Sequence, residues 1–559
     1  MASPHAPFHP IIYVRGFAMT RGEIDETSAD PFCGFNLGST VFRAVPDRER
    51  KPRKFVFESP VIRLGSDFGY RDVYEDGYDL LDPEWTDDPR HRLTSRSIVV
   101  YRYYDEASKL LGKGETPPIE TFATNLGALI LKVRDVVCAP HPDTKNSERV
   151  APEDFRCYLV AHSMGGLVCR AFLQNPKLDP GGAAKYVDKL FTYATPHNGI
   201  DVAGVNVPSW LSFGDTDNFN RERMAEYLAI DEDVYEKTER VDWLPEARFP
   251  SSRVFTMVGT NRQDYEAGMG LSRAFVGHGS DGLVRIENAT LNGLKSDGRP
   301  GDPCAKAFTF RAHSGVFGIV NSEEAYQNLA RFLFGDVRVD VHAEFDDVRV
   351  PDKLIGDEKK GKVDALYQVE LLASPRGKLW YLTRRVAEED SVACFSHKEW
   401  RAAKGSVKKY LSTVFLANRA RVDPTRPSLA YSVSLGVRVP DYEVDRTLWF
   451  DEHYEGGYLF RDALVIELVP PTNSPVETEA KPARKTRSKP KAASTGEWDV
   501  KYAWQGQAVQ PARESVDATR LTKGRVEVTI PFDSGRNPGV TGRLRFVISA
   551  WNEETRPTS

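Results

Sequence analysis

The 559-residue sequence contains only six cysteines and no long apolar run, and its charges nearly balance. The cysteines are scattered without a C-x-x-C pair. This distribution argues against a disulfide scaffold, and it does not have the ligand spacing of a zinc site. No uninterrupted apolar stretch approaches the roughly 20 residues that a membrane-spanning helix needs. The formal net charge of −5 at pH 7 argues against a nucleic-acid binder that works through a domain-wide basic surface.

The N-terminal residues, MASPHAPFHPIIYV, lack the basic stretch and apolar core that together mark a secretory signal. Sparse, unpaired cysteines are what a protein in a reducing compartment would hold. We therefore expect a cytoplasmic protein, or one that is exported by a route without a cleaved signal peptide.

Strand-like and helix-like segments alternate over residues 1–336, which predicts an α/β domain with a mostly parallel sheet. Apolar residues recur at spacings of three and four within Phe122–Val133 and Leu167–Phe172, and both segments should be helices. A further helix should open at Asn321 or Ser322 and end before Gly335. The expected strands are Ile11–Val14, Ser97–Tyr103, Cys157–Ala161, Lys189–Ala194, Arg253–Gly259 and Ala307–Arg311.

The periodicity changes after residue 336, where apolar and polar residues begin to alternate. Val337–Phe345, Leu429–Val439 and Val526–Ile530 have a period of two, which is typical of half-buried antiparallel strands. We therefore predict a β-sandwich-like domain at 337–559. The one helical pattern in it is a short one near Lys398–Leu411.

One segment of this second domain, Pro470–Glu497, is rich in Pro, Lys, Arg, Thr and Ser and poor in apolar residues. Such a composition cannot bury enough surface to offset the entropy of ordering, so a disordered loop between two strands is expected. Its six basic residues between Lys481 and Lys491 could touch an anionic membrane or nucleic acid, although a solvated tether is the simpler interpretation. The partner of the sandwich-like domain stays unknown.

The stretch LVAHSMGG at 159–166 approximates the G-x-S-x-G pattern of a serine hydrolase. An apolar strand precedes it and an amphipathic helix follows, which is the strand–turn–helix context that exposes a nucleophilic serine. Ala161 stands at the first glycine position and adds one methyl group where strand and helix approach, and Gly165 meets the second position. Ser163 is therefore the candidate nucleophile.

A nucleophilic serine needs a base and an acid, and in this type of fold the chain order is Ser, then Asp or Glu, then His. His313 follows the strand-like AFTFRA and precedes glycines that allow a loop. Asp281, in GHGSDGLVRIENA, lies on the loop before that strand. The sequence therefore predicts Asp281 as the acid and His313 as the base.

Other acidic and basic residues are weaker candidates. Asp264 follows the preceding strand and is the second choice for the acid. His278 is too close to Asp281 in the chain for the usual order. The side chain of His162 should point away from the serine, which favours a packing role. Asp302 lies in a Gly/Pro turn and is more simply a turn residue.

The oxyanion of an acyl-transfer intermediate needs two preorganised backbone donors. The first should be the N–H of Met164, the residue after the candidate nucleophile. The second should come from the loop after the early strand IIYV, where Gly16 supplies a tight turn and the Phe17 N–H is the predicted donor. Arg15 stands where hydrolases carry a histidine, and a salt bridge explains it as well as a catalytic role does.

Together these motifs resemble those of α/β-hydrolase lipases and esterases, especially the GPI-inositol-deacylase-like and lecithin:cholesterol acyltransferase-like serine hydrolases. The resemblance covers residues 10–335. It implies an α/β-hydrolase fold with Ser163, Asp281 and His313 as the triad, and a structural role for His197. The motifs that carry it are AHSMGG at 161–166, YATPHNG at 193–199, SDGLV at 280–284 and HSGVFGIVNS at 313–322.

The resemblance also implies a cap over the site, at about 200–252. Apolar and aromatic side chains in a mobile cap would favour an acyl or lipid substrate, but they could equally form the core of the cap itself. The residues concerned are Val207, Trp210, Leu211, Phe213, Phe219, Tyr227, Leu228 and Trp243.

The sequence thus predicts a serine hydrolase that cleaves small or lipid-like carboxylic esters through an acyl-enzyme, without a metal or organic cofactor. Peripheral membrane contact could accompany this activity, and nucleic-acid binding is not expected. A calcium site at Asp346, Asp347, Asp352 and Asp357 is less favoured than a solvated loop. Three alternatives stay open: an amidase or thioesterase with the same triad, a binding module with a vestigial hydrolase domain, and an exported phospholipase.

Overall fold

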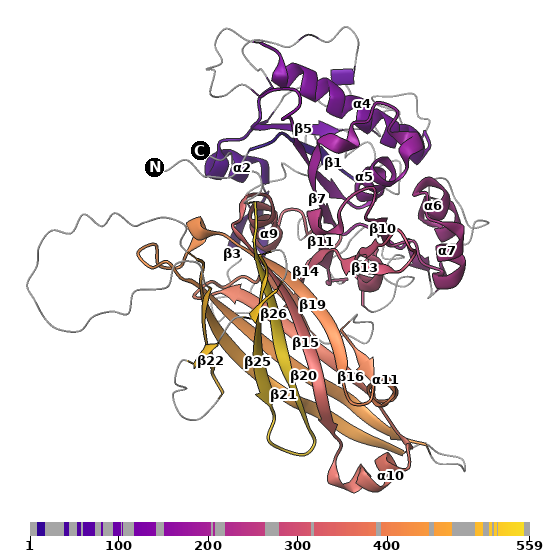
Figure 1. The fold of residues 1–559 in the computed structure, drawn as a ribbon, viewed down its shortest axis with the longest axis vertical. Coiled ribbons are helices and arrows are strands. Elements are labelled where there is room, and N and C mark those ends of the chain that lie inside the picture. Colours follow the sequence, from indigo (N-terminus) through magenta and orange to yellow (C-terminus); the bar gives the residue numbers. More distant parts are fainter. Residues whose placement is uncertain are drawn as a thin grey trace, which may run out of the picture. The chain divides into compact units, whose positions relative to one another are not determined.

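The chain divides by its internal contacts into two units, which are described separately (Figure 1). The first consists chiefly of Met1–Phe334 with Leu382–Val392, and the second of Gly335–Tyr381 with Ala393–Glu554. The computed structural model describes residues 8–16, 39–43, 53–57, 60–72, 80–81, 86, 93–101, 103, 117–140, 150–202, 205–206, 218–262, 279–314, 318–386, 393–445, 452–471, 498–506, 514–516, 519–521 and 524–552.

A parallel sheet forms the centre of the first unit, with described strands in the order β14-β11-β7-β6-β1-β5-β4. Every described pairing in it is parallel. Its central strands are apolar and fully buried, as expected for a sheet that is covered on both faces. The strands are β1 (Ile11–Val14), β4 (Arg71–Asp72), β5 (Ser97–Tyr101), β6 (Cys157–His162), β7 (Val187–Tyr193), β11 (Val254–Gly259) and β14 (Ala305–Thr309).

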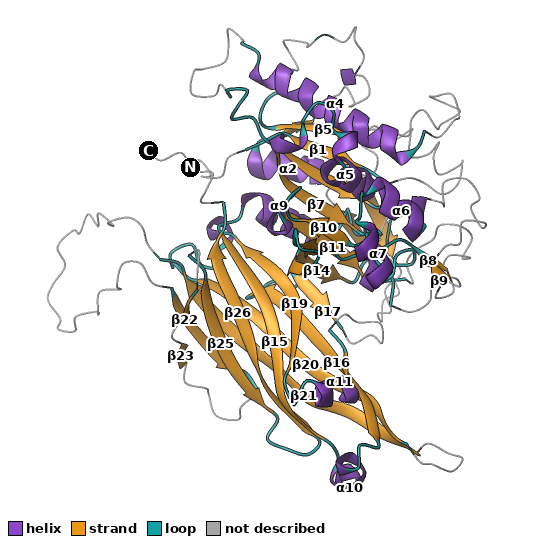
Figure 2. Ribbon diagram, turned by 45° about the vertical axis from the view of Figure 1, so that its right-hand side comes forward, coloured by secondary structure: helices purple, strands orange, loops and turns teal. Residues whose placement is uncertain are grey.

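Helices cover both faces of this sheet (Figure 2). Two of them, α4 and α5, pack side by side on one face, and α2 and α9 lie on the other. On the second face, the ring of Phe332 in α9 contacts those of Phe191 and Phe255 in the sheet. The Ser322 hydroxyl caps α9 by accepting the Ala325 N–H at 3.2 Å. The helices are α2 (Pro60–Phe68), α4 (Ile119–Cys138), α5 (Met164–Gln174) and α9 (Glu323–Phe334).

In its described residues, the insertion expected as a cap contains the strand pair β8-β9, the short helices α6 and α7, and β10, which is one strand of a small separate sheet, β10-β12-β13. Phe219, Tyr227 and Leu228 are buried within it. Val207, Trp210, Leu211 and Phe213 lie outside the described residues. The smaller elements of this unit are β2 (Ser39–Arg43), β3 (Arg53–Phe57), β8 (Asp201–Val202), β9 (Val205–Asn206), α6 (Arg221–Tyr227), α7 (Glu232–Thr238), β10 (Trp243–Pro245), β12 (Asn292–Leu294) and β13 (Pro300–Pro303).

The second unit is a sandwich of two antiparallel sheets (Figure 1). One has the order β19-β15-β26-β25-β24, and the other contains β16-β20-β21-β22-β23, with β18 beside β16. Inward and outward residues alternate along β15 and β20, as the sequence period requires. The strands are β15 (Val337–Arg349), β16 (Val363–Pro375), β18 (Phe395–Ser396), β19 (Val407–Leu416), β20 (Leu429–Val444), β21 (Glu452–Val469), β22 (Asp499–Trp504), β23 (Glu514–Val516), β24 (Thr519–Arg520), β25 (Val526–Asp533) and β26 (Gly539–Ala550).

The helix predicted near Lys398–Leu411 is wrong in its second half. A short helix, α11 (His397–Ala402), begins there, but β19 starts at Val407. The reason is long-range pairing, because Val407 lies opposite Phe345 of β15 and its strand completes the edge of the sheet. A further short helix in the described part of this unit is α10 (Ile355–Lys359).

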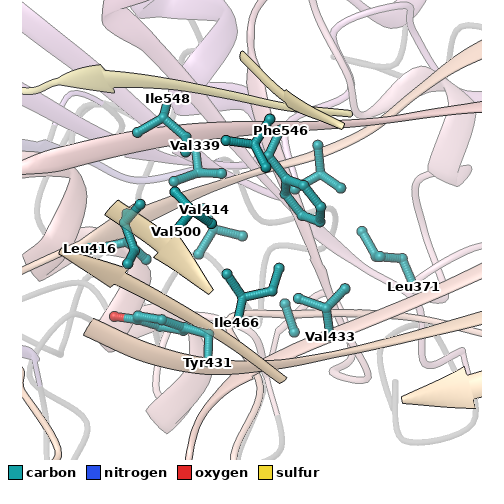
Figure 3. Close-up of a pocket in the computed structure, with 14 residues that line it drawn as sticks. Val339, Leu371, Val414, Leu416, Tyr431, Val433, Ile466, Val500, Phe546 and Ile548 are labelled. Carbon is teal, nitrogen blue, oxygen red and sulfur yellow. The ribbon is translucent and has the colours of Figure 1, made fainter. Parts of the chain in front are cut away.

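The two sheets enclose an apolar cavity of about 50 Å³ (Figure 3). Figure 3 shows side chains from both sheets pointing into it, among them Val339 and Phe546 on one side and Leu371 and Val433 on the other. Its lining offers no charged group and only the Tyr431 hydroxyl as a polar one, so nothing in it would orient a polar ligand. We interpret it as a packing void of the sandwich core.

The predicted fold class, an α/β-hydrolase-type domain with a cap insertion followed by a β-sandwich-like region, is confirmed. In the described parts of the chain, no helix is both long and apolar enough to cross a bilayer. Nor do three His, Cys, Asp or Glu residues gather there as metal ligands would. Two of the acidic residues considered for calcium make ion pairs instead, Asp346 with Arg543 and Asp347 with Arg349. Of the predicted loop 470–497, residues 472–497 lie outside the described residues.

Candidate active site

Ser163 lies in the tight turn between β6 and α5, at the centre of the parallel sheet. Its backbone has φ 53° and ψ −130°, a conformation that is strained for a residue with a Cβ atom. Two hydrogen bonds hold it there: the Ser163 N–H donates to the Tyr193 carbonyl at 2.9 Å, and the Ser163 carbonyl accepts the Gly166 N–H at 3.0 Å. This is the elbow geometry that projects a serine hydroxyl above the sheet.

Two glycines allow the chain to pass close to this elbow. A Cβ atom on Gly165 would lie 2.1 Å from the Val14 carbonyl oxygen, so the helix can approach β1 only with glycine there. A Cβ atom on Gly16 would lie 2.3 Å from the Ser163 Cβ atom and 2.9 Å from its Oγ atom. The loop after β1 therefore passes directly over the serine side chain. Ala161, the departure from the motif, is fully buried in β6 and keeps its place in the sheet opposite Val14.

The structure brings Ser163, Asp281 and His313 together. The His313 Nε2 atom lies 2.9 Å from the Ser163 Oγ atom, and the His313 Nδ1 atom lies 2.9 Å from the Asp281 Oδ2 atom. All three residues are at least 95% buried. Since an ionised carboxylate can only accept, Nδ1 carries the hydrogen and Nε2 is left to accept the serine proton.

Backbone contacts fix both partners of the serine. The Asp281 Oδ1 atom accepts the N–H groups of Leu283 and Val284 at 3.0 and 2.8 Å, which holds the carboxylate in one orientation. The His313 N–H donates to the Asp281 carbonyl at 3.0 Å. Asp281 and His313 are thus joined by their backbones as well as by their side chains, which makes their relative position rigid.

His162 makes a contact that its sequence position did not reveal. Its Nε2 atom donates to the His313 carbonyl oxygen at 2.9 Å, and the two rings lie 5.0 Å apart. Burial, together with the nearby charges of His313 and Arg15, holds the pKa of His162 well below its usual range. His162 is therefore a neutral donor that braces the loop carrying His313, whereas packing alone was predicted for it.

The other candidates fall in three groups. Met164 is the first residue of α5, so its N–H has no partner within the helix and points out of the helix N-terminus beside Ser163. Asp302 is exposed on β13, and His197 is fully buried with its Nε2 atom 3.1 Å from the Thr192 hydroxyl. Three further candidates, Phe17, Asp264 and His278, lie outside the described residues.

Arg170 of α5 ties the insertion to the elbow helix, a role that the sequence analysis missed. The guanidinium is fully buried and donates to the carbonyls of His197 and Val241 at 2.8 Å and of Trp243 at 3.0 Å. Burial lowers the pKa of Arg170 to about 10, which leaves it charged at neutral pH. The available signal was an arginine in the middle of an otherwise apolar helix, LVCRAFL.

No protein-family model matches the chain, and no curated protein is similar to it in sequence. Among solved structures, it is similar to the mature form of Bacillus licheniformis lipase BlEst2, with 13% identity over 59% of this chain and 93% of that one and a TM-score of 0.28. It is similar to Legionella pneumophila phospholipase PlaB at 13% identity over 80% and 90%, with a TM-score of 0.25. For Aspergillus fumigatus lipase B the identity is 12%, over 53% and 46%, with a TM-score of 0.22.

Proposed function

We propose that the protein is a serine hydrolase that cleaves carboxylic esters, with Ser163 as the nucleophile. The observation that carries this proposal is the hydrogen-bonded chain from the Ser163 hydroxyl through His313 to Asp281, with both links at 2.9 Å, on a strained strand-to-helix turn. A serine is a poor nucleophile unless a base removes its proton, and this arrangement supplies the base and orients it.

In the proposed reaction, His313 Nε2 takes the proton from Ser163 Oγ as that oxygen attacks the carbonyl carbon of the ester. Asp281 holds the imidazole in position and stabilises the imidazolium that forms. His313 then gives the proton to the departing alcohol, which leaves an acyl-enzyme. A water molecule, deprotonated by the same imidazole, attacks the acyl carbon, and the release of the carboxylic acid restores the Ser163 hydroxyl.

The negative charge on the carbonyl oxygen in the intermediate needs donors that are in place beforehand. Met164 supplies one, because its N–H opens α5 next to the nucleophile and the helix dipole favours an anion there. The loop after β1 supplies the second in this proposal, through the Phe17 N–H, and the close approach of Gly16 to Ser163 supports that assignment.

The proposed substrates are lipid-like or other acyl esters, the class that the resemblance to GPI-inositol-deacylase-like and lecithin:cholesterol acyltransferase-like enzymes suggests. An amide or thioester would react through the same residues. A panel of p-nitrophenyl esters of graded chain length, with a matched anilide and thioester, tests this proposal. We expect ester hydrolysis to exceed anilide hydrolysis, with long chains preferred over acetate. Absence of hydrolysis for every ester would contradict the proposed function.

Replacing His162 tests whether its bond to the His313 carbonyl positions the base. His162→Leu removes the donor and is expected to lower kcat/KM for ester hydrolysis by about 10- to 100-fold, since a misplaced base is costly. His162→Gln can still donate from its amide and should keep most of the activity. A pH profile of kcat/KM should shift in the leucine variant alone, which a loss of packing would not cause. Equal loss in both variants would contradict the positioning role.

A further inference from the structure

We infer that one end of the β-sandwich is a docking surface for an anionic lipid bilayer. The connection after β16 runs through Arg376, Gly377, Lys378, Leu379 and Trp380. Leu379 is fully exposed, an unusual position for a leucine, and the flanking Arg376 and Lys378 are also exposed. The bond from the Lys378 N–H to the Pro375 carbonyl at 3.1 Å closes a turn that presents Leu379 to solvent.

A second basic connection begins beside the first. The Arg376 N–H donates to the Ala430 carbonyl at 3.0 Å, which places the loop after β16 next to the start of β20. The chain reaches β20 through residues 417–428, where Arg419 is exposed and Val422 is 47% exposed. We call Arg376, Lys378, Leu379, Arg419 and Val422 the sandwich tip. It combines exposed apolar side chains with cations, all within the second unit.

A third connection starts and ends at the same end of the sandwich. Val469, the last residue of β21, pairs with Asp499, the first residue of β22, and its neighbour Leu468 lies opposite Leu429. Residues 470–498 connect the two strands. Of these, 472–497 lie outside the described residues and are not counted in the sandwich tip.

The chemistry of the sandwich tip fits a bilayer better than a nucleic acid. Arg376 and Lys378 would lie at the level of anionic headgroups, where each cation contributes to binding. Leu379 would reach the acyl boundary and leave water, and Trp380, which is half-buried at the base of the loop, has the amphipathic ring that favours the interface. A nucleic acid would use the cations but would leave Leu379 in water.

Vesicle binding tests this inference directly. The full chain is sedimented with vesicles of phosphatidylcholine alone and of phosphatidylcholine with about one-third phosphatidylserine, at low salt. We expect binding to the anionic vesicles only. Leu379→Asp, and separately Arg376→Glu with Lys378→Glu, should each lower the partition coefficient by about tenfold or more. Leu379 is exposed, so its replacement should leave folding intact.

The opposite end of the same sandwich supplies matched controls. Ile355 is 37% exposed, and Lys359 and Lys360 are exposed, on the connection between β15 and β16. Ile355→Asp, and Lys359→Glu with Lys360→Glu, make the same chemical changes and should bind vesicles as the wild type does. No binding by the wild type, unchanged binding by the tip variants, or equal loss in the control variants would overturn the inference.

Two further measurements separate this inference from its rivals. The first measures binding of a labelled DNA oligonucleotide. The inference fails, and the surface is a nucleic-acid site, if the wild type and Leu379→Asp bind this DNA equally well while the wild type does not bind anionic vesicles. Hydrolysis of a short-chain ester without vesicles should be unchanged in the tip variants, because none of these residues belongs to the candidate active site. Vesicle binding without ester hydrolysis would refute the proposed function and leave the docking surface standing.

Discussion

Replacing Ser163 by alanine is expected to lower kcat for ester hydrolysis by about four orders of magnitude or more. The hydroxyl is the only group of the chain that the proposed reaction joins covalently to the acyl group, so its removal leaves only uncatalysed attack by water and the residual effect of the oxyanion donors. The His313→Ala variant should lose a similar amount, and the double variant little more, since the two residues act as one unit. Steady-state hydrolysis of the preferred p-nitrophenyl ester is the measurement.

Two controls keep this result interpretable. Ser163→Gly also removes the hydroxyl, and glycine adopts the positive φ of this turn without strain. A folding defect caused by the alanine methyl group would therefore appear in Ser163→Ala and not in Ser163→Gly. Ser432→Ala changes a serine on β20 of the second unit and should retain full activity. Hydrolysis by Ser163→Ala at more than about one-tenth of the wild-type rate would contradict the assigned nucleophile.

The second large effect concerns stability and arises at Arg170. Replacing it by methionine should lower the free energy of unfolding of the first unit by about 3 kcal/mol or more, because the buried carbonyls of His197 and Val241 would lose this donor and that of Trp243 would keep only the Gln174 amide. Methionine keeps much of the volume, so the loss measures the hydrogen bonds rather than a cavity. Urea unfolding followed by circular dichroism gives the free energy.

Arg170→Lys separates charge from geometry. A lysine keeps the charge, but one ammonium group cannot reach the three carbonyls and the Gln174 side chain that the planar guanidinium contacts, so we expect an intermediate loss. Arg299→Met removes an exposed arginine that pairs with Asp297, and it should leave the midpoint of urea unfolding unchanged. If Arg170→Met unfolds at the same urea concentration as Arg299→Met, the network does not hold the insertion in place.

This network changes how the insertion is interpreted. The resemblance implied a cap over the site, whose apolar side chains would either favour a lipid substrate or form the core of the cap itself. In its described part, the Gln174 side-chain amide donates to the Leu228 and Trp243 carbonyls, at 3.3 and 3.1 Å, in addition to the bonds from Arg170. Residues 228–243 are therefore anchored to α5. A movement that opens the cap would have to involve other parts of the insertion.

The local elements were predictable because they depend on periodicity. The strands around Ser163 were found within about two residues of their ends, since each is a short apolar run bounded by turn residues. The end of β5 was predicted at Tyr103, but the strand ends at Tyr101. Tyr103 extends the pattern of apolar residues although it lies beyond the strand. Part of the edge strand β19 was predicted to be a helix. Its strand conformation depends on pairing with β15, which is far away in the sequence, and a local pattern does not reveal such a pairing.

The sequence predicted which three side chains meet at the candidate site, but not the contacts that hold them in place. Ser163 and His313 each come directly after a recognisable strand, Asp281 lies on the loop before the strand that leads to His313, and chain order limits the choices. The bracing bond from His162 to the His313 carbonyl joins residues that lie 151 positions apart, and Arg170 bonds to Val241 and Trp243, which lie 71 and 73 positions further along the chain. Such contacts depend on how the elements pack, which no local pattern encodes.

One measurement tests directly whether the protein is an active enzyme or a binding module that retains the triad. A fluorophosphonate probe reacts with a serine only when a neighbouring base activates it. After labelling of the folded full-length protein, mass spectrometry of the digested chain should find one adduct, on Ser163, and the adduct should be absent in His313→Ala. No adduct on Ser163 in the wild type, or equal labelling when His313 is removed, would contradict the account.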